Sequence, residues 1–182
     1  MATVNMVLFE PEIPQNAGNI MRTCVATNTV LHLIRPLGFR MDEAHLKRSG
    51  VNYLPYLKYY IYDDWNDFLN KQIKSNPNAQ MYYLTRYGKH HLFDVHTNDD
   101  TKDYYLVLGK ESTGIPKEIL KEDLDHCIRL PMTDKVRALN VSNVAAIMIY
   151  EAWRQLGFPN MCEYEPDSSI PGFKGKDYLE EE

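Results

Sequence analysis

The segment at residues 141–153 most constrains the fold, because it carries apolar residues on nearly every face of a helix. It follows a strand-like run that ends at Leu130 and Pro131, and a short polar loop at residues 133–140. A helix without a clear polar face is buried on two sides. In a chain of 182 residues, another subunit covers the second side most easily, so we expect the last helix to meet a partner.

Length and composition indicate one domain. A chain of 182 residues with 44% hydrophobic residues can bury one substantial core. We expect a single domain over residues 1–160 and an acidic, partly disordered tail over residues 161–182. No apolar run approaches the roughly 20 residues that span a bilayer, and no basic stretch precedes the first apolar residues. We therefore expect a soluble, cytoplasmic protein without a membrane partner.

The charge of the chain is unevenly distributed. The net charge is −5, and residues 163–182 account for it with seven acidic residues and two lysines, so the rest of the chain is neutral. Between residues 22 and 48, basic residues outnumber Asp42 and Glu43, with His32 and His45 between them. This local excess suits a phosphate-bearing partner. Charge alone is equally compatible with a solvated surface balanced by distant carboxylates.

The cysteines and histidines do not indicate a metal site or a disulfide framework. The three cysteines are widely spaced and form no Cys-x-x-Cys pair. His90, His91 and His96 lie in a predicted polar loop without a carboxylate or cysteine at ligand spacing. We therefore expect no bound metal.

Strand and helix patterns alternate along the chain. Apolar runs predict strands at residues 3–9, 30–34, 80–85, 103–108 and 126–130, and the tyrosine-rich residues 51–62 also favour an extended segment. Helices are predicted to begin at Asn16, Asp42, Asp63 or Asp64, Pro116, and Asn140 or Ser142. This alternation predicts an α/β domain with a mostly parallel sheet, whose ligand site lies at the carboxyl ends of the strands.

Three loops that follow predicted strands carry the chemistry. The first, residues 10–22, places Asn19 and Arg22 on one helix face, although an asparagine-capped helix with one exposed arginine fits equally well. The second, residues 106–116, has a glycine directly after the strand, which lets backbone approach a ligand closely. The third, residues 130–140, offers main-chain groups to a small molecule. No Walker or Gly-x-Gly-x-x-Gly motif is present, which disfavours ordinary nucleotide folds.

Together these loops resemble a known family. The motifs are Asn-x-Gly-Asn-x-x-Arg at residues 16–22, Leu-Gly-x-Glu-x-x-Gly-x-Pro at 108–116, Ile-x-Leu-Pro-Met at 128–132, Leu-Asn-x-Ser-Asn at 139–143 and Tyr-Glu-Ala-Trp-Arg-Gln at 150–155. In this order they resemble the SPOUT-class RNA 2′-O-methyltransferases, and most of all the small tRNA (cytidine/uridine-2′-O)-methyltransferases that act at the wobble nucleotide. The resemblance covers residues 4 to about 160.

The resemblance implies a C-terminal trefoil knot in the α/β fold and a homodimer that pairs through the first and last helices. It implies that S-adenosyl-L-methionine is the cofactor and that the anticodon stem-loop of tRNA is the partner. The implied cofactor residues are Leu84, Thr85, Gly109, Glu111, Leu130, Ala138, Leu139 and Asn140. The implied catalytic residues are Arg22, Asn16 and Asn19. For RNA binding, we expect Arg22, Arg35, Lys47, Arg48 and Arg154.

The sequence departs from the family pattern at two places. Ala138 stands where the family usually has serine, and Thr85-Arg86-Tyr87-Gly88 replaces Thr-Lys-Gly. If the serine acts through its side chain, a hydrogen bond worth roughly 0.5–1.5 kcal/mol is lost. An alternative function is therefore a non-catalytic knotted dimer that binds S-adenosylmethionine or RNA. Ala138 favours this alternative, whereas Arg22 and the two asparagines disfavour it.

Overall fold

The computed structural model describes residues 1–41 and 53–180. Within these ranges, seven strands form one sheet in the order β3-β2-β1-β6-β4-β7-β5, and every neighbouring pair is parallel. The strands are β1 (Thr3–Phe9), β2 (Val30–Ile34), β3 (Tyr59–Tyr62), β4 (Ala79–Leu84), β5 (His90–His91), β6 (Asp103–Leu108) and β7 (Cys127–Arg129). The predicted α/β class with a mostly parallel sheet is confirmed.

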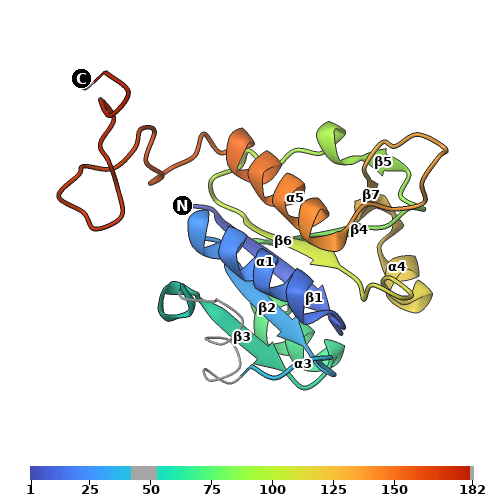
Figure 1. Cartoon of the computed structure of the whole chain (residues 1–182). Helices are drawn as coiled ribbons and strands as arrows, with labels where there is room; N and C mark the ends of the chain where they lie inside the picture. The colour runs from blue at the N-terminus through green and yellow to red at the C-terminus, as the bar shows by residue number, and fades with distance from the viewer. Residues whose placement is uncertain (42–52, 181–182) are drawn as a thin grey trace.

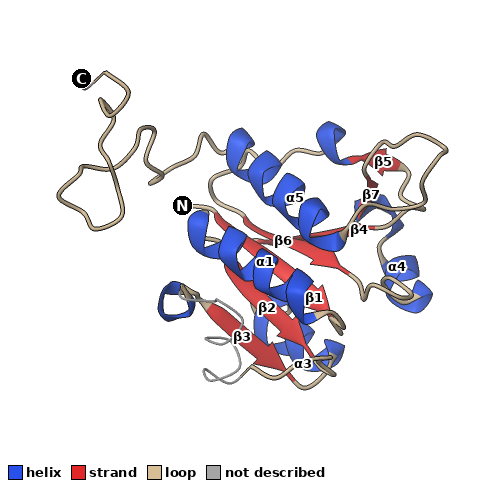
Figure 2. Cartoon of the chain, viewed as in Figure 1, coloured by secondary structure: helices blue, strands red, loops and turns tan. Residues whose placement is uncertain are grey.

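Helices cover both faces of the sheet (Figures 1 and 2). They are α1 (Pro14–Ala26), α3 (Trp65–Phe68) with its π-helical continuation η2 (Leu69–Ile73), α4 (Lys117–Glu122) and α5 (Val141–Gln155), with 3-10 turns η1 (Leu54–Tyr56), η3 (Leu92–Asp94) and η4 (Leu124–His126). Helices α1 and α5 pack side by side on one face. Helices α3 and α4 pack on the other face, which makes three layers.

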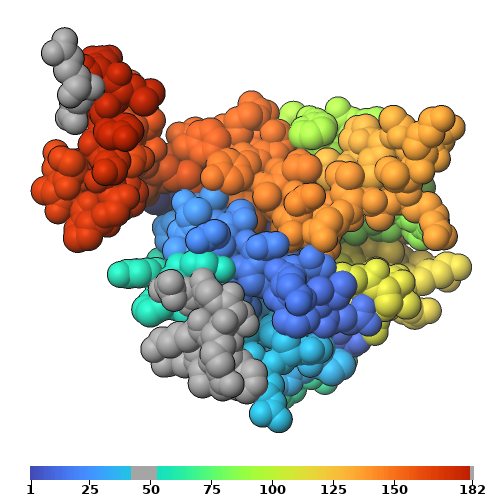
Figure 3. Space-filling model, in the orientation of Figure 1, coloured from blue at the N-terminus to red at the C-terminus, as the bar shows by residue number. Residues whose placement is uncertain are grey.

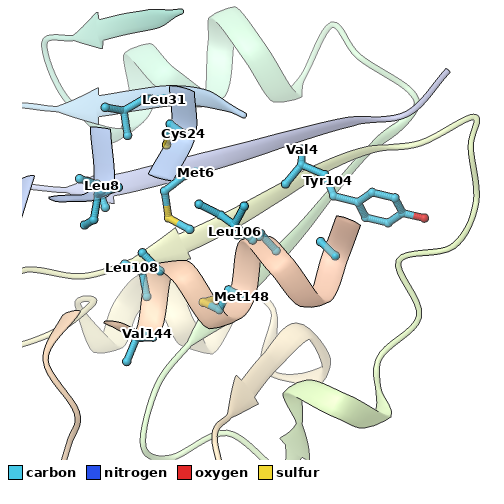
Figure 4. Close-up of a cluster of buried hydrophobic side chains, with 14 of the residues drawn as sticks. Val4, Met6, Leu8, Cys24, Leu31, Tyr104, Leu106, Leu108, Val144 and Met148 are labelled. Atoms are coloured by element: carbon cyan, nitrogen blue, oxygen red, sulfur yellow. The ribbon is translucent and has the colours of Figure 1, made fainter. Parts of the chain in front are cut away.

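The sheet has an apolar core on each face. Met6 and Leu8 of β1 belong to the core under α1 and α5, whereas Val7 and Phe9 belong to the core on the opposite face. This follows from the alternation of side chains along a strand. Figure 4 shows the first core, in which Met148 of α5 packs with residues of β1 and β6. Parallel strands that are covered on both faces have continuous runs of apolar residues. Such runs are easy to recognise in the sequence, so these strands are predicted well.

Helix α5 has one buried and one open side in the single chain. The Asn140 side chain caps it by accepting a hydrogen bond from the backbone N–H of Ser142 at 2.9 Å. Met148 and Ile149 are fully buried, whereas Tyr150 is 49% exposed. The side that the sequence assigns to a partner is therefore open to solvent here.

Several predicted helix and strand boundaries are wrong. Asn16 does not cap α1, because the helix begins at Pro14, and Asn16 is buried within its first turns. Proline is favoured at the first helical position, because its missing N–H would have no partner within the helix there. The predicted loop around His90 contains β5, a two-residue strand too short to show a periodicity. Of the predicted extended segment at residues 51–62, the described part from residue 53 forms a strand only at β3, and the predicted helix at residues 42–48 lies outside the described residues.

The tail is described up to residue 180. From residue 161 to that point the chain forms turns and bends but no helix or strand, and in Figure 1 it leads away from the body. The domain boundary at residue 160, the partial disorder of the tail and the trefoil knot stay predictions. In the part of the chain that the structure describes, no helix is long and apolar enough to cross a membrane.

His32 lies in a buried polar network between the strands. It is 1% exposed, and its ring nitrogens contact the Tyr62 hydroxyl at 2.8 Å and the Asn5 side-chain oxygen at 3.1 Å. The rings of Tyr60 and Phe68 also pack against it. Burial lowers the pKa of His32 from 6.5 to about 4, so this histidine is neutral and contributes nothing to a basic surface.

We predict that His32 makes stability fall in acid. Because its folded pKa lies below its unfolded value, the unfolded chain takes up the proton first as the pH drops. The contribution of His32 is complete above pH 6.5 and is lost towards pH 4, a decrease of about 3 kcal/mol. Urea unfolding from pH 7.5 to 4.5 measures this. A His32→Gln variant should lose this part of the pH dependence, and an unchanged pH dependence in that variant would assign it to other groups.

Candidate functional site

The candidate site lies at the carboxyl ends of four adjacent strands. Strands β1, β6, β4 and β7 are neighbours in the sheet and run in the same direction. The loops that leave them therefore emerge at one edge (Figure 1). The three loops that the sequence singles out are among these four, so the structure brings them together as predicted.

The loop after β6 turns sharply at Gly109. A Cβ atom at Gly109 would lie 2.1 Å from the carbonyl carbon of Gly114 and 2.2 Å from the nitrogen of Ile115, so only glycine fits. Gly114 has a φ of +75° and donates its N–H to the Lys110 carbonyl at 2.8 Å. These contacts close the loop into a tight reversal whose backbone approaches its neighbours directly.

Three polar side chains link three of the loops. The Asn16 amide donates to the Glu111 carboxylate at 3.1 Å, and the Asn140 amide donates to the Asn16 side-chain oxygen at 3.0 Å. Asn16 is 7% exposed, so these bonds satisfy a buried amide. The structure thus joins one predicted catalytic residue with two predicted cofactor residues.

Two carboxylates tie the β1 loop to the β6 loop reciprocally. The Glu111 carboxylate accepts from the backbone N–H groups of Glu12 at 2.9 Å and Ile13 at 3.4 Å. The Glu12 carboxylate accepts from the hydroxyl and backbone N–H of Ser112, both at 2.8 Å. These two bonds hold the pKa of the Glu12 carboxyl below its ordinary value. Sequence reasoning missed Glu12 and Ser112, because no local pattern pairs residues 100 positions apart.

The loop after β4 packs against β7. Thr85 donates its backbone N–H to the Ile128 carbonyl at 2.9 Å, and a Cβ atom at Gly88 would lie 2.4 Å from the Ile128 carbonyl carbon. Leu84 is half-buried beside this loop, and Leu130 is buried at the end of β7. The tip of the loop, Arg86 and Tyr87, is exposed.

The loop after β7 is open to solvent in the single chain. Ala138, Leu139 and Asn140 are all exposed, and Leu139 is 42% exposed. The Asn140 side chain is nevertheless fixed, because its oxygen also accepts from the Ser142 hydroxyl at 2.6 Å.

Arg22 and Asn19 are exposed on α1, whereas Asn16 faces the loops. The Arg22 guanidinium carbon lies 5.4 Å from the centroid of the Tyr53 ring, and the Tyr53 hydroxyl donates to the Gly18 carbonyl at 2.6 Å. Burial raises the pKa of Tyr53, which the charge of Arg22 partly offsets. Within the described residues, no hydrogen bond connects the side chains of Arg22 or Asn19 to Asn16.

The other predicted RNA-binding residues are spread over the molecule. Arg35 pairs with Asp63 at 2.7 Å. Arg154 donates twice to Glu151, at 2.8 and 2.9 Å, and this holds the pKa of the Glu151 carboxyl below its ordinary value. Lys47 and Arg48 lie outside the described residues. Their role in binding stays a prediction.

Solved structures share this arrangement of strands and loops. A structure from Bacillus anthracis, provisionally described as an RNA methyltransferase, is 49% identical with a TM-score of 0.82, and the match covers 87% of this chain and 97% of that one. A second structure, reported for the 2-OH methylation of C/U34 on tRNA, is 37% identical with a TM-score of 0.74, and the match covers 85% and 97% of the two chains. The fold is therefore that of RNA methyltransferases.

Among curated proteins, one from Geobacillus stearothermophilus is 48% identical over 155 residues, which cover 85% of this chain and 96% of that protein. It is provisionally named a tRNA (cytidine(34)-2′-O)-methyltransferase. The model of the SpoU rRNA Methylase family matches residues 3–150. The chain belongs to the SpoU rRNA methylase family, and the predicted family is confirmed.

We predict that Gly109→Ala destabilises the protein. The added methyl group would overlap the backbone of Gly114 and Ile115, and such overpacking costs roughly 1–3 kcal/mol. Gly18→Ala is the matched control, because Gly18 lies inside α1 and, apart from the adjacent residues and the backbone of that helix, no described atom lies within 4 Å of its Cβ position. The control should gain up to about 1 kcal/mol from helix propensity. Urea unfolding compares the two, and equal stability of both variants would contradict the steric argument.

Proposed function

We propose that this protein transfers a methyl group from S-adenosylmethionine to the ribose 2′-hydroxyl of the wobble nucleotide, cytidine or a modified uridine, in the anticodon stem-loop of tRNA. The observation that carries the proposal is the Glu111-Asn16-Asn140 network, which joins the loops of β6, β1 and β7 at one sheet edge. The names of the relatives support the same reaction. Because tRNA is the substrate, we place the enzyme in the cytoplasm.

The residues at this edge fit S-adenosylmethionine. Gly109 and Gly88 keep the loops free of side chains at their closest approaches, so backbone groups can face a ligand. Leu84 and Leu130 supply apolar surface. We propose that they hold the cofactor together with Thr85, Glu111, Ala138, Leu139 and Asn140. When bound, the cofactor supplies an electrophilic methyl group on a sulfonium.

Glu111 is best suited to hold the loops in place. Its carboxylate already accepts three hydrogen bonds from the start of α1, and a carboxylate has roughly four lone-pair positions. Little capacity remains for a direct contact, so we propose that Glu111 serves the cofactor by holding these loops in place. Ala138 has no hydroxyl, so its proposed contact is through the backbone, and the loss of the usual serine then costs little.

Arg22 is the proposed catalytic residue. The 2′-hydroxyl is a weak acid, so a neighbouring group must take or polarise its proton as the new C–O bond forms. A guanidinium stays protonated in proteins and is a poor base. We therefore propose that Arg22, exposed on α1, orients the substrate and binds phosphate, and also polarises the hydroxyl. Asn19 flanks it on α1, and Asn16 fixes the start of that helix against Glu111.

The rival function is a knotted dimer that binds S-adenosylmethionine or RNA without catalysis. The exposed Ala138, which has lost the serine hydroxyl, favours it. The presence of Arg22 together with Asn16 and Asn19 disfavours it, because binding alone does not require the proposed catalytic group. A methylation assay separates the two functions.

We predict that the protein places label from S-adenosylmethionine on ribose of total cellular tRNA. Nucleoside mapping should find 2′-O-methylated pyrimidine at the wobble position. Arg22→Ala should abolish turnover while leaving the cofactor Kd, measured by calorimetry, unchanged. Label on a base would indicate a base methyltransferase instead of a ribose methyltransferase. Absence of label would favour the non-catalytic protein that binds S-adenosylmethionine or RNA. Near-normal methylation by Arg22→Ala would remove its proposed role.

We also propose that two copies pair through the outer faces of α1 and α5. These helices lie side by side, so their open sides form one surface (Figure 1). On α5 this surface carries Asn143, Ile147 and Tyr150, of which Tyr150 is 49% exposed. Asn19 and Arg22 lie on the open side of α1, so pairing brings the second copy close to the candidate site.

We predict that Tyr150→Glu dissociates the dimer. Burying a carboxylate against an apolar surface is unfavourable, and central tyrosines contribute about 2 kcal/mol or more to interfaces, which is roughly 30-fold in Kd. Tyr56→Glu is the control, because Tyr56 is 77% exposed on η1. Sedimentation velocity measures both. A monomeric wild-type protein, or a Tyr150→Glu dimer of unchanged Kd, would contradict pairing through α5.

A further inference from the structure

Two loops of the candidate site carry basic residues that form no ion pair within the described part of the chain. The sequence analysis did not assign these two loops to RNA. The loops are residues 85–91, after β4, and residues 129–140, at the end of β7. They carry one acidic residue, Asp134. We call their five cations the basic rim: Arg86, Lys89, Arg129, Lys135 and Arg137.

The two loops lie together in space. Strand β5 pairs with β7 through His90 with Ile128 and His91 with Arg129, and Thr85 bonds to Ile128. In Figure 1 the segment 130–140 arcs past β5 before it enters α5. In Figure 3 the same segment, in orange, forms an outer margin of the molecule. The rim therefore lies towards the β5 edge of the sheet, whereas Arg22 and Arg35 lie towards the β3 edge.

The cations of the rim are available to an external partner. Over residues 1–41 and 53–180, none of the five forms an ion pair. Four of them are exposed, and Arg129 is half-buried. Arg35 and Arg154 differ, because each is already neutralised by a carboxylate of the chain. Five cations that have no ion pair in the described part of a chain of net charge −5 favour a polyanion at this surface.

An aromatic ring stands among these cations. Tyr87 is 71% exposed, and the Arg86 guanidinium lies 4.6 Å from its ring centroid. The backbone beneath is fixed, because Gly88 approaches Ile128 closely and donates its N–H to the Thr85 carbonyl at 3.2 Å. A ring on a fixed loop beside cations is the arrangement that stacks on a nucleobase while the cations bind phosphates.

We infer that the basic rim binds the phosphate backbone of the RNA substrate and that Tyr87 stacks on one of its bases. The inference rests on the proposed function, since it assigns a surface to that substrate. It places RNA contacts on the β5 side of the cofactor loops, opposite the contacts proposed for α1. This inference explains the departure from Thr-Lys-Gly to Thr85-Arg86-Tyr87-Gly88. The loop keeps a positive charge at Arg86 and gains a ring at Tyr87 that can stack on a base.

The double variant Lys89→Gln/Lys135→Gln tests the rim, with one change on each loop. The control is Lys71→Gln/Lys74→Gln, which removes the same charge from two exposed lysines, Lys71 in η2, where it pairs with Asp67, and Lys74 at the end of η2. Fluorescence anisotropy of a labelled anticodon stem-loop gives the Kd over a range of KCl concentrations. Loss of two phosphate contacts should raise the Kd about tenfold and lower the slope of log Kd against log salt by roughly 1 to 2.

Tyr87→Phe and Tyr87→Ala test the stacking. Phenylalanine keeps the ring and should bind the stem-loop as the wild type does, whereas alanine should weaken binding roughly tenfold. Calorimetry of S-adenosylmethionine binding accompanies each variant. The inference predicts an unchanged cofactor Kd in all of them.

Two results would overturn the inference. The first is that the rim variant and the control variant bind the stem-loop with the same Kd and with the same slope of log Kd against log salt. The other is a weakened cofactor Kd with unchanged RNA binding by cofactor-free protein, which would assign the rim to the cofactor. A different result would contradict the proposed function. If the wild-type protein binds RNA through the rim but transfers no methyl group, the proposed reaction is wrong, whereas the assignment of the rim to RNA binding is retained.

Discussion

Parallel pairing of the strands is the constraint on which the rest of the structure depends. A parallel sheet needs a crossover between each pair of strands and needs cover on both faces. Helices α1 and α5 cover one face, and α3 and α4 cover the other. The same pairing brings every carboxyl end to one edge. The loops after β1, β6, β4 and β7 therefore meet there, although they come from distant parts of the chain.

Hydrogen bonds to carboxylates link the loops after β1 and β6. Glu111 accepts backbone N–H groups from the start of α1, and Glu12 accepts them from the β6 loop. Bonds to charged acceptors are stronger than neutral ones, so each loop depends on the other for its conformation. The β6 loop is thereby fixed against the start of α1, the helix that carries Arg22.

Pairing within the chain decides which cations can serve RNA. The net charge of −5 comes from the tail, so the body is neutral. To bind a phosphate, Arg35 would have to give up its ion pair with Asp63, and Arg154 its ion pair with Glu151. The loss of the ion pair offsets part of the free energy gained from the phosphate. The basic rim has no such competitors among the described residues. Overall charge is thus a poor guide to RNA binding here, whereas the local balance of charge is informative.

The sequence by itself determined the α/β class, the family, the strands at residues 3–9, 30–34 and 103–108, and the three loops, because apolar periodicity and short motifs are local. Only the tertiary structure decided that β5 is a strand, that Asn16 binds Glu111 instead of capping α1, and that Glu12 pairs with Ser112. The contacts of Asn16 and Glu12 join residues about 100 positions apart, and these contacts and the pairing of β5 depend on strand order, which no local pattern encodes.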